Sequence, residues 1–257
     1  MLLAVDIGNS QTVLGVFERD ELVEHWRIST DAVRTADEVA LVFQGLLAFA
    51  DLSFTRNVHG IVVSSVVPMV TEILREMIER YFLFDPVLVA PGIRTGINLR
   101  YENPREIGPD RIANAVAVGE LHGAPGIVVD FGTSTNFDIV DANGDFVGGV
   151  IAPGVMTSMN ALVARAARLP KVEVSRPRSV IGQTTVEAMQ SGIVYGFAGQ
   201  VDAIVRRIQD TLDAPDAVVV ATGGLASAVL EECATIDDHD PWLTLRGLRL
   251  IWERNTS

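Results

Sequence analysis

The stretch Val5-Asp6-Ile7-Gly8-Asn9-Ser10 returns 124 residues later as Val129-Asp130-Phe131-Gly132-Thr133-Ser134. The same offset matches Val16 with Val140 and Leu22 with Phe146. Each copy starts with an apolar strand that ends in Asp-x-Gly, so the sequence predicts one strand–turn–strand unit built twice. We expect the two turns to face each other as a clamp for nucleotide phosphates. Glycine lets the backbone approach an anion, the next side chains add hydrogen-bond donors, and the aspartate can hold a metal ion.

A purely structural interpretation also exists for each copy, because Asp, Asn and Gly are common in hairpin turns. A single Asp-x-Gly is therefore a weak functional signal. Two copies at equivalent places in two matching segments favour the phosphate interpretation.

The composition limits the function classes. The chain has 257 residues and a net charge of −13, with 48% hydrophobic and 21% charged residues, as in soluble globular proteins. The charge disfavours a nucleic-acid or membrane surface, although glycine turns and helix N-termini bind phosphate without net basic charge. Cys233 is the single cysteine and the four histidines have no ligand spacing, which excludes disulfides and predicts no zinc site. No signal peptide or membrane-spanning run is recognised, so we expect a cytoplasmic protein.

Strands and helices are expected to alternate in both halves. The expected strands are 2–7, 12–18, 22–28, 59–67, 86–90, 126–131, 135–141, 145–151 and 217–222. The expected helices are 36–50 after the capping box Thr35–Glu38, then 69–84, 110–121, 156–169, 186–212, 227–234 and 245–255. This order predicts an α/β fold of two lobes, each a mixed sheet with helices on both faces.

Three further motifs are candidates for a site. Gly108-Pro109-Asp110-Arg111 is either a well-formed helix start or a base beside an anion binder. Gly223-Gly224 ends a strand, where a nucleotide's adenosine could lie. Thr184 and Glu187 form a second expected capping box, which places Thr185 in the first helical turn, where it could meet an anion.

The helix expected after Thr184 carries a face of small residues: Ala188, Gly192, Gly196, Gly199 and Ala203. Glycine weakens a helix by roughly 1 kcal/mol per site relative to alanine. Three of them in one helix predict close approach of another backbone. That backbone belongs either to the same lobe or to a second subunit.

Together these motifs resemble the type III pantothenate kinases, of the actin-like and sugar-kinase superfamily. The matching segments are Asp6–Asn9, Tyr101–Pro104, Ile107–Arg111, Asp130–Thr133, Gly148–Gly154, Gly182–Thr185, Ala188–Gly192 and Thr222–Gly224. They occur in the family's order over essentially the whole chain. The resemblance implies two actin-like (ribonuclease-H-like) lobes, at 1–115 and 116–257.

The resemblance also implies site residues and cofactors. The implied ATP-binding residues are Asp6, Ile7, Gly8, Asn9, Ser10, Gln11, Thr12, Val13 and Thr133. The implied pantothenate contacts are Tyr101, Gly108, Pro109, Asp110, Arg111 and Thr185, with Asp110 as proton acceptor. Asp130 is implied to bind a monovalent cation, potassium or ammonium, while magnesium accompanies ATP. The family works as a homodimer.

Three departures from the family pattern are visible. Pro109 stands where alanine is usual, Thr133–Asn136 reads Thr-Ser-Thr-Asn instead of Thr-Ala-Thr-Thr, and Gln183-Thr184 replaces Lys-Asn. The first two retain helix-start or hydrogen-bonding chemistry, whereas the third removes a positive charge. The expected reaction is ATP-dependent phosphorylation of pantothenate, the first step of coenzyme A synthesis. The alternatives are another small-molecule kinase on this scaffold and a nucleotide-binding regulator.

Overall fold

The computed structural model describes residues 1–82, 84–90, 92–166, 168–224 and 227–256. Contacts between Cα atoms divide the chain into two units. The first contains Met1–Asn98, Glu102–Ala117 and the segment from Leu243 onward, and the second contains Leu99–Tyr101 and Val118–Trp242. Each unit has its own five-stranded sheet with parallel and antiparallel pairs. The predicted α/β class is therefore confirmed.

The sheet of the first unit has the order β3-β2-β1-β4-β5, in which β1 is antiparallel to β2 and parallel to β4. Its strands are β1 (Leu2–Ile7), β2 (Gln11–Glu18), β3 (Glu21–Ser29), β4 (Gly60–Ser65) and β5 (Val87–Leu88). Its helices are α1 (Ala36–Phe49), α2 (Phe54–Asn57), α3 (Pro68–Tyr81), the 3-10 helix η1 (Pro104–Glu106), α4 (Pro109–Leu121) and α8 (Leu243–Thr256). The last residues of α4 belong to the second unit.

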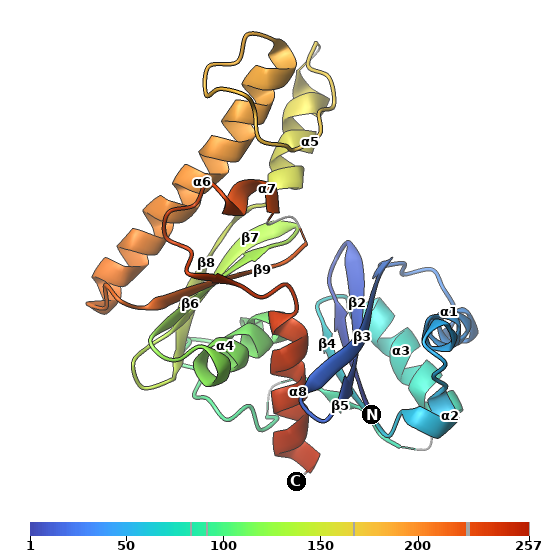
Figure 1. The fold of residues 1–257 in the computed structure, drawn as a ribbon. Helices are drawn as coiled ribbons and strands as arrows, with labels where there is room; N and C mark the ends of the chain where they lie inside the picture. The colour runs from blue at the N-terminus through green and yellow to red at the C-terminus, as the bar shows by residue number, and fades with distance from the viewer. Residues whose placement is uncertain (83, 91, 167, 225–226, 257) are drawn as a thin grey trace. The chain divides into compact units, whose positions relative to one another are not determined.

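Helices cover both faces of the first sheet (Figure 1). The odd residues Leu3, Val5 and Ile7 of β1 share one core with α1 and α3. On the other face α8 lies so close that a Cβ on Gly60 would come within 2.7 Å of the Trp252 ring. Side chains alternate along a strand, so Asp6 points to the face that α8 covers.

The sheet of the second unit has the order β10-β9-β6-β7-β8. Its strands are β6 (Gly126–Phe131), β7 (Ser134–Val140), β8 (Phe146–Pro153), β9 (Val218–Thr222) and β10 (Asp238–His239). Its helices are α5 (Val155–Arg165), α6 (Thr185–Leu212) and α7 (Ser227–Leu230). Buried residues of α5 and α6 form one core with β6, β7 and β9, and the two helices lie over the same face of the sheet (Figure 1).

The two units repeat one strand arrangement, but not at a constant offset. The first turn spans residues 8–11 in one unit and 132–134 in the other, because Ile7 pairs with Thr12 whereas Phe131 pairs with Thr135. The second connection compensates, since residues 18–21 separate the paired Phe17 and Leu22 whereas residues 141–145 separate the paired Val140 and Phe146. The match of Val16 with Val140 is therefore wrong.

Pairing of the strands shows the correct correspondence. Val140 pairs with Gly126 as Phe17 pairs with Leu2, so Val140 takes the place of Phe17. Both sheets shift register at the matching step, between Val16 and Phe17 and between Ile139 and Val140. The offset is thus 124 in the first strand, 123 in the second and 124 again in the third, where Leu22 and Phe146 do correspond.

Most expected elements are confirmed, and most differences lie at the ends of helices and strands. The capping box of Thr35 and Glu38 is present at the start of α1. The helices expected at 69–84 and 156–169 end at Tyr81 and Arg165, because Phe82 and Ala166 adopt extended backbone angles. Residues 83 and 167 lie outside the described part of the chain. The sequence prediction missed α2 and β10.

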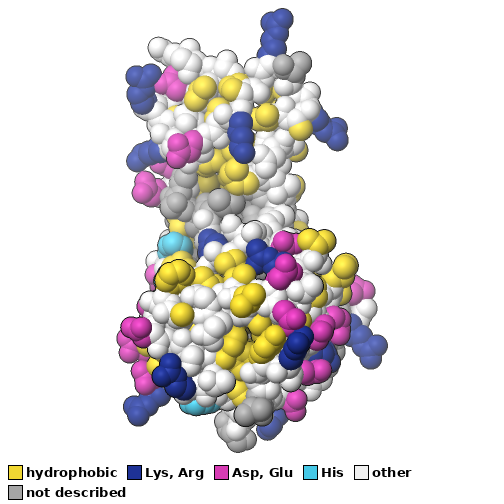
Figure 2. Space-filling model, turned by 90° about the vertical axis from the view of Figure 1, so that its right-hand side faces the viewer, with side chains coloured by type: hydrophobic (Ala, Val, Ile, Leu, Met, Phe, Trp, Pro, Cys, Tyr) yellow, Lys and Arg dark blue, Asp and Glu magenta, His cyan; other side chains and the backbone are white. Residues whose placement is uncertain are grey.

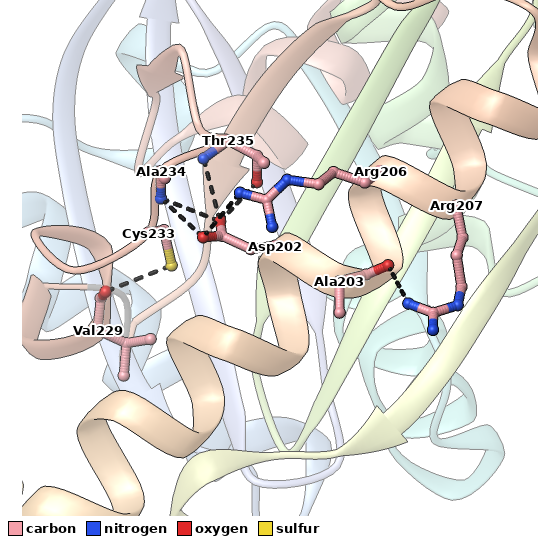
Figure 3. A network of polar contacts seen from close by, with 8 residues as sticks. All are labelled: Asp202, Ala203, Arg206, Arg207, Val229, Cys233, Ala234 and Thr235. Carbon is pink, nitrogen blue, oxygen red and sulfur yellow. Dashed lines mark hydrogen bonds and ion pairs between the residues drawn. The ribbon is translucent and has the colours of Figure 1, made fainter.

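The helix expected at 227–234 is the short α7, because the segment after it is bound by an aspartate of α6 instead of continuing the helix. The Asp202 carboxylate accepts hydrogen bonds from the backbone N–H groups of Ala234 and Thr235, both at 3.0 Å (Figure 3). The Cys233 thiol contacts the Val229 carbonyl in the same network, and burial raises its pKa to about 12. This thiol is therefore not a reactive nucleophile.

The surface carries charges of both signs. On the face shown in Figure 2, acidic and basic side chains are interspersed among apolar ones over the described residues. Within the part of the chain that the structure describes, no helix has both the length and the apolar character needed to cross a bilayer.

Candidate functional site

The first Asp-x-Gly turn is held by Thr30, the residue that follows β3. The Gly8 N–H donates to the Gln11 carbonyl at 2.9 Å, which closes the turn. The Thr30 N–H donates to the Ser10 carbonyl at 3.1 Å, and the Thr30 hydroxyl donates to the Gly8 carbonyl at 2.7 Å. The Thr12 hydroxyl lies 2.9 Å from the Thr30 hydroxyl. Two carbonyl groups of the turn are thus bound from the end of β3.

The second turn has the same backbone pattern with a different anchor. The Gly132 N–H donates to the Ser134 carbonyl at 2.9 Å, and the Gly154 N–H donates to the Thr133 carbonyl at 3.1 Å. The Thr157 hydroxyl donates to the same Thr133 carbonyl at 2.6 Å. A Cβ on Gly154 would lie 2.5 Å from the carbonyl oxygens of Gly132 and Thr133, so no side chain fits there.

The neighbours of the two aspartates differ. Asp6 pairs with Val13 on one side and with Ser64 on the other. Asp130 pairs with Asn136 and with Thr222. Directly paired residues place their side chains on the same face of a sheet. Asp6 therefore has an apolar neighbour and a hydroxyl, whereas Asp130 lies in a row of oxygen-bearing side chains.

The charge of Asp110 acts on Asp6 within the first unit. Burial raises the pKa of Asp110, while the Arg111 N–H, which donates to its Oδ1 at 2.9 Å, and the Arg111 charge oppose the rise. Burial and then the negative charge of Asp110 raise the pKa of Asp6 to about 7, and the Ser64 hydroxyl offsets part of this rise. The structure thus brings the first turn and the Gly108–Arg111 motif together.

The Gly108–Arg111 motif begins α4 at Pro109, as its sequence predicts. The space at Gly108 is filled by the Asp110 carboxylate, because a Cβ there would lie 2.4 Å from Asp110 Oδ1. Arg111 is only 7% exposed. A helix-start carboxylate and a buried guanidinium are therefore neighbours, which is the arrangement expected for a base beside an anion binder.

Gly223 lies against the second aspartate at the end of β9. Its φ is +96°, and a Cβ there would lie 2.7 Å from Asp130 Oδ1 and 2.6 Å from the Phe131 carbonyl oxygen. Only glycine fits this position. The Gly223-Gly224 pair, where the adenosine is expected, thus begins beside the Asp130 turn, and residues 225 and 226 lie outside the described part of the chain.

The expected pantothenate contacts fall in both units. Tyr101 belongs to the second unit, where its ring lies 6.2 Å from that of Phe146. Thr185 is exposed and is the first residue of α6. Gly108, Pro109, Asp110 and Arg111 belong to the first unit.

Only one of the two hydrogen bonds of the capping box expected at the start of α6 is present. The Thr184 hydroxyl accepts from the Glu187 N–H at 3.2 Å, as predicted. The Glu187 carboxylate, however, accepts from the Gln183 N–H at 3.1 Å and is bound by Arg178.

Sequence reasoning missed Thr30 and Ser64. Thr30 lies outside the repeated Asp-x-Gly segment, and Ser64 lies inside an apolar strand. One signal could have found Thr30, since it precedes by 124 residues the glycine that ends the Gly148–Gly154 segment.

Comparison with known proteins gives full-length matches. A family model described as type III pantothenate kinase matches residues 2–207. A protein of Acidothermus cellulolyticus with the same name is 58% identical over 99% of this chain and 99% of its own length. One from Streptomyces griseus subsp. griseus, also named type III pantothenate kinase, is 56% identical over 100% of this chain and 99% of its own.

Solved structures share the fold. A candidate Baf family transcriptional activator from Campylobacter jejuni has a TM-score of 0.60 at 22% identity, covering 98% of each chain. The ROK hexokinase from Thermus thermophilus has a TM-score of 0.50 at 16% identity, covering 97% of each chain. Sugar kinases are therefore among the proteins that share this two-sheet architecture.

Proposed function

The chain belongs to the type III pantothenate kinase family, and we propose how its residues phosphorylate pantothenate with ATP, the first step of coenzyme A synthesis. The assignment of roles depends on the environment of the Asp110 carboxyl group at the start of α4. It is half-buried, its pKa is raised, and Asp6 and the buried Arg111 lie beside it. A base, a phosphate turn and an anion binder are the groups that phosphoryl transfer requires.

Asp110 acts as the general base. It accepts the proton of the primary hydroxyl of pantothenate while that oxygen forms a bond to the γ-phosphorus of ATP. The bond between the γ-phosphorus and the bridging oxygen breaks in line, and ADP leaves. The raised pKa of Asp110 increases its proton affinity, and the Arg111 charge opposes the rise.

The two turns bind the phosphates of ATP. The first provides the backbone and side chains of Asp6, Ile7, Gly8, Asn9, Ser10, Gln11, Thr12 and Val13, and the second provides Thr133. Hydrogen bonds hold carbonyl groups of both turns. Backbone N–H groups fixed in this way suit a phosphate without rearrangement.

Asp130 binds a monovalent cation, potassium or ammonium. The carboxylate, the Asn136 amide and the Thr222 hydroxyl offer oxygen ligands, and Gly223 leaves room for the backbone to approach. Such ligands suit hard cations. Among the described residues no three His, Cys, Asp or Glu side chains gather, so neutral oxygens would complete the site. Magnesium enters with ATP and neutralises phosphate charge.

The proposed pantothenate contacts have separate roles. Arg111 holds the carboxylate, Gly108 and Pro109 shape the pocket beside Asp110, and Tyr101 and Thr185 complete the set. Thr185 is suited to this role because it opens α6, where backbone N–H groups and the helix dipole favour an anion.

The active form is a homodimer, with α6 at the subunit interface. A Cβ on Gly192, Gly196 or Gly199 would meet nothing within 4 Å among the described residues, so packing inside the unit does not require these glycines. Close approach of a second α6 would require these glycines. Gly196→Leu should convert the dimer to monomer in sedimentation analysis, whereas Gly45→Leu, on the equally open α1, should not.

We place the enzyme in the cytoplasm, since its single cysteine gives no structural disulfide.

ADP release from ATP tests the function. We expect release with pantothenate that rises with potassium, and little with other hydroxylated acceptors. Turnover with a different acceptor alone would indicate another small-molecule kinase, and ATP binding without turnover would indicate a regulator.

A further inference from the structure

We propose that Thr30 is a positioning residue of the kinase, which fixes the first phosphate turn by holding the Gly8 carbonyl. This inference rests on the proposed role of the turn in ATP binding. Thr30 itself lies outside the turn and follows β3.

The geometry fixes one peptide group of the turn. The Thr30 hydroxyl donates to the Gly8 carbonyl at 2.7 Å and lies 2.9 Å from the Thr12 hydroxyl, which is buried. A trans peptide unit is planar, so its N–H points opposite to its C=O. Binding the Gly8 carbonyl therefore directs the Asn9 N–H away from Thr30.

The Thr30 backbone contributes a second anchor. Its N–H donates to the Ser10 carbonyl at 3.1 Å, so one residue holds two carbonyl groups of the same turn. The turn contains Gly8, whose backbone is free to adopt other angles. Without the hydroxyl, the peptide group after Gly8 would lose its fixed direction, and phosphate binding would have to restore it.

The second unit provides an internal comparison. Gly154 takes the place of Thr30, because its N–H also donates to a carbonyl of the turn, that of Thr133. No side chain fits there, and the hydroxyl donor comes instead from Thr157. The two hydroxyls bind different carbonyl groups, that of Gly8 in the first turn and that of Thr133 in the second, so each turn has a threonine donor of its own.

The lack of a side chain at Gly154 has a consequence for a buried threonine of the second unit. Thr135 corresponds to Thr12, since both pair with the last residue of the preceding strand. Without a threonine at position 154, the Thr135 hydroxyl is buried and has no hydrogen-bond partner within the described chain. The Thr12–Thr30 pair is therefore specific to the first turn.

Thr30→Val tests the inference, because it keeps the shape and removes the hydroxyl. We expect the dissociation constant of a non-hydrolysable ATP analogue with magnesium to rise about five- to tenfold, the effect of one ordinary hydrogen bond. The KM for pantothenate should stay within about twofold, and Thr30→Ser should restore nucleotide affinity. Thr95→Val is the matched control, since the buried Thr95 hydroxyl also donates to a backbone carbonyl, that of Ile97 at 3.0 Å.

The outcomes separate the possible causes. Wild-type nucleotide affinity in folded Thr30→Val, or an equal loss in Thr95→Val, would overturn the inference. If Thr30→Val does not fold, the double variant Thr12→Val/Thr30→Val removes both hydroxyls together and takes its place. If Asp6→Ala also leaves nucleotide affinity unchanged, the turn itself does not bind ATP, and the proposed function fails separately.

Discussion

The two Asp-x-Gly turns have one backbone plan and different side-chain surroundings. In both, the glycine N–H closes the turn and the residue after the third strand, or its counterpart, donates to a turn carbonyl. Around the first aspartate lie Val13 and Ser64, and around the second lie Asn136 and Thr222. The repeat thus preserves how a turn is held and varies what its aspartate meets.

The difference suggests separate tasks for the two carboxylates. Asp6 has a pKa of about 7 because it is buried near another carboxyl group. Its charge is poorly stabilised by the protein alone, so a cation accompanying ATP would stabilise it. The proposed cation at Asp130 would instead be held by the oxygen-bearing side chains of Asn136 and Thr222. On these proposed roles, one repeated unit would serve a transient charge in one place and a fixed charge in the other.

The largest expected effect comes from Asp110→Asn, which removes the proposed base beside the first turn. We expect kcat to fall about 10³-fold, within the range for loss of a general base. The affinity for ATP should change little, because the variant keeps the shape of the side chain. Steady-state kinetics and nucleotide titration measure both.

Asp20→Asn is the control for this variant, since Asp20 is an exposed turn residue of the same unit. It should leave kcat unchanged. The base must be ionised, so wild-type kcat should also fall as the pH drops through the raised pKa of Asp110. Near-normal kcat in Asp110→Asn would remove Asp110 as the base.

The next effect concerns the anchor of the second turn. Gly154→Ala places a Cβ 2.5 Å from two carbonyl oxygens, so we expect the free energy of unfolding to fall by about 2–3 kcal/mol. Gly45→Ala on α1 meets open space and should instead stabilise the chain by about 1 kcal/mol. Urea denaturation measures both. Equal effects would show that the second turn is not tightly packed.

A smaller effect is the pH dependence of the free energy of unfolding that Asp6 causes. Folding raises the pKa of Asp6 from 3.8 to about 7, so the folded chain binds the proton more tightly and loses stability as pH rises through this window. Asp6→Asn should therefore raise the free energy of unfolding at pH 8 by about 1–2 kcal/mol, after allowance for partial solvent contact. The difference should vanish near pH 4. Chemical denaturation at the two pH values, without nucleotide, tests this, and a pH-independent difference would contradict it.

The smallest effect compares the paired and the unpaired threonine. Thr12→Val removes a hydrogen bond and should cost about 1 kcal/mol, whereas Thr135→Val removes a hydroxyl without a partner in the described chain and should cost nothing or stabilise. Thermal unfolding of the two variants measures the difference. Equal losses would mean that the two positions are not different environments.

Much of the fold could be predicted from the sequence, because its signals are local. The Asp-x-Gly repeat gave the strand–turn–strand units, and Thr35 with Glu38 gave the start of α1. The constant offset could not reveal two compensating turn lengths, since register depends on pairing between strands. β10 and the early end of α7 depend on distant partners, such as Asp202, and had no local signal.

For the site, the sequence predicted the residues that bear charge or form turns. It could not predict the pKa of Asp6, which depends on burial and on Asp110, a residue far away in the chain. It also missed Thr30, because a threonine after a strand has no distinctive local pattern. Residues that position others are found only when the contacts are known.

A structure with a non-hydrolysable ATP analogue, magnesium and pantothenate tests the central claim most directly. We predict that phosphate oxygens accept hydrogen bonds from residues 8–11 and from Thr133, with the pantothenate hydroxyl at the Asp110 carboxylate. A triphosphate that contacts neither turn, or a hydroxyl bound away from Asp110, would contradict it.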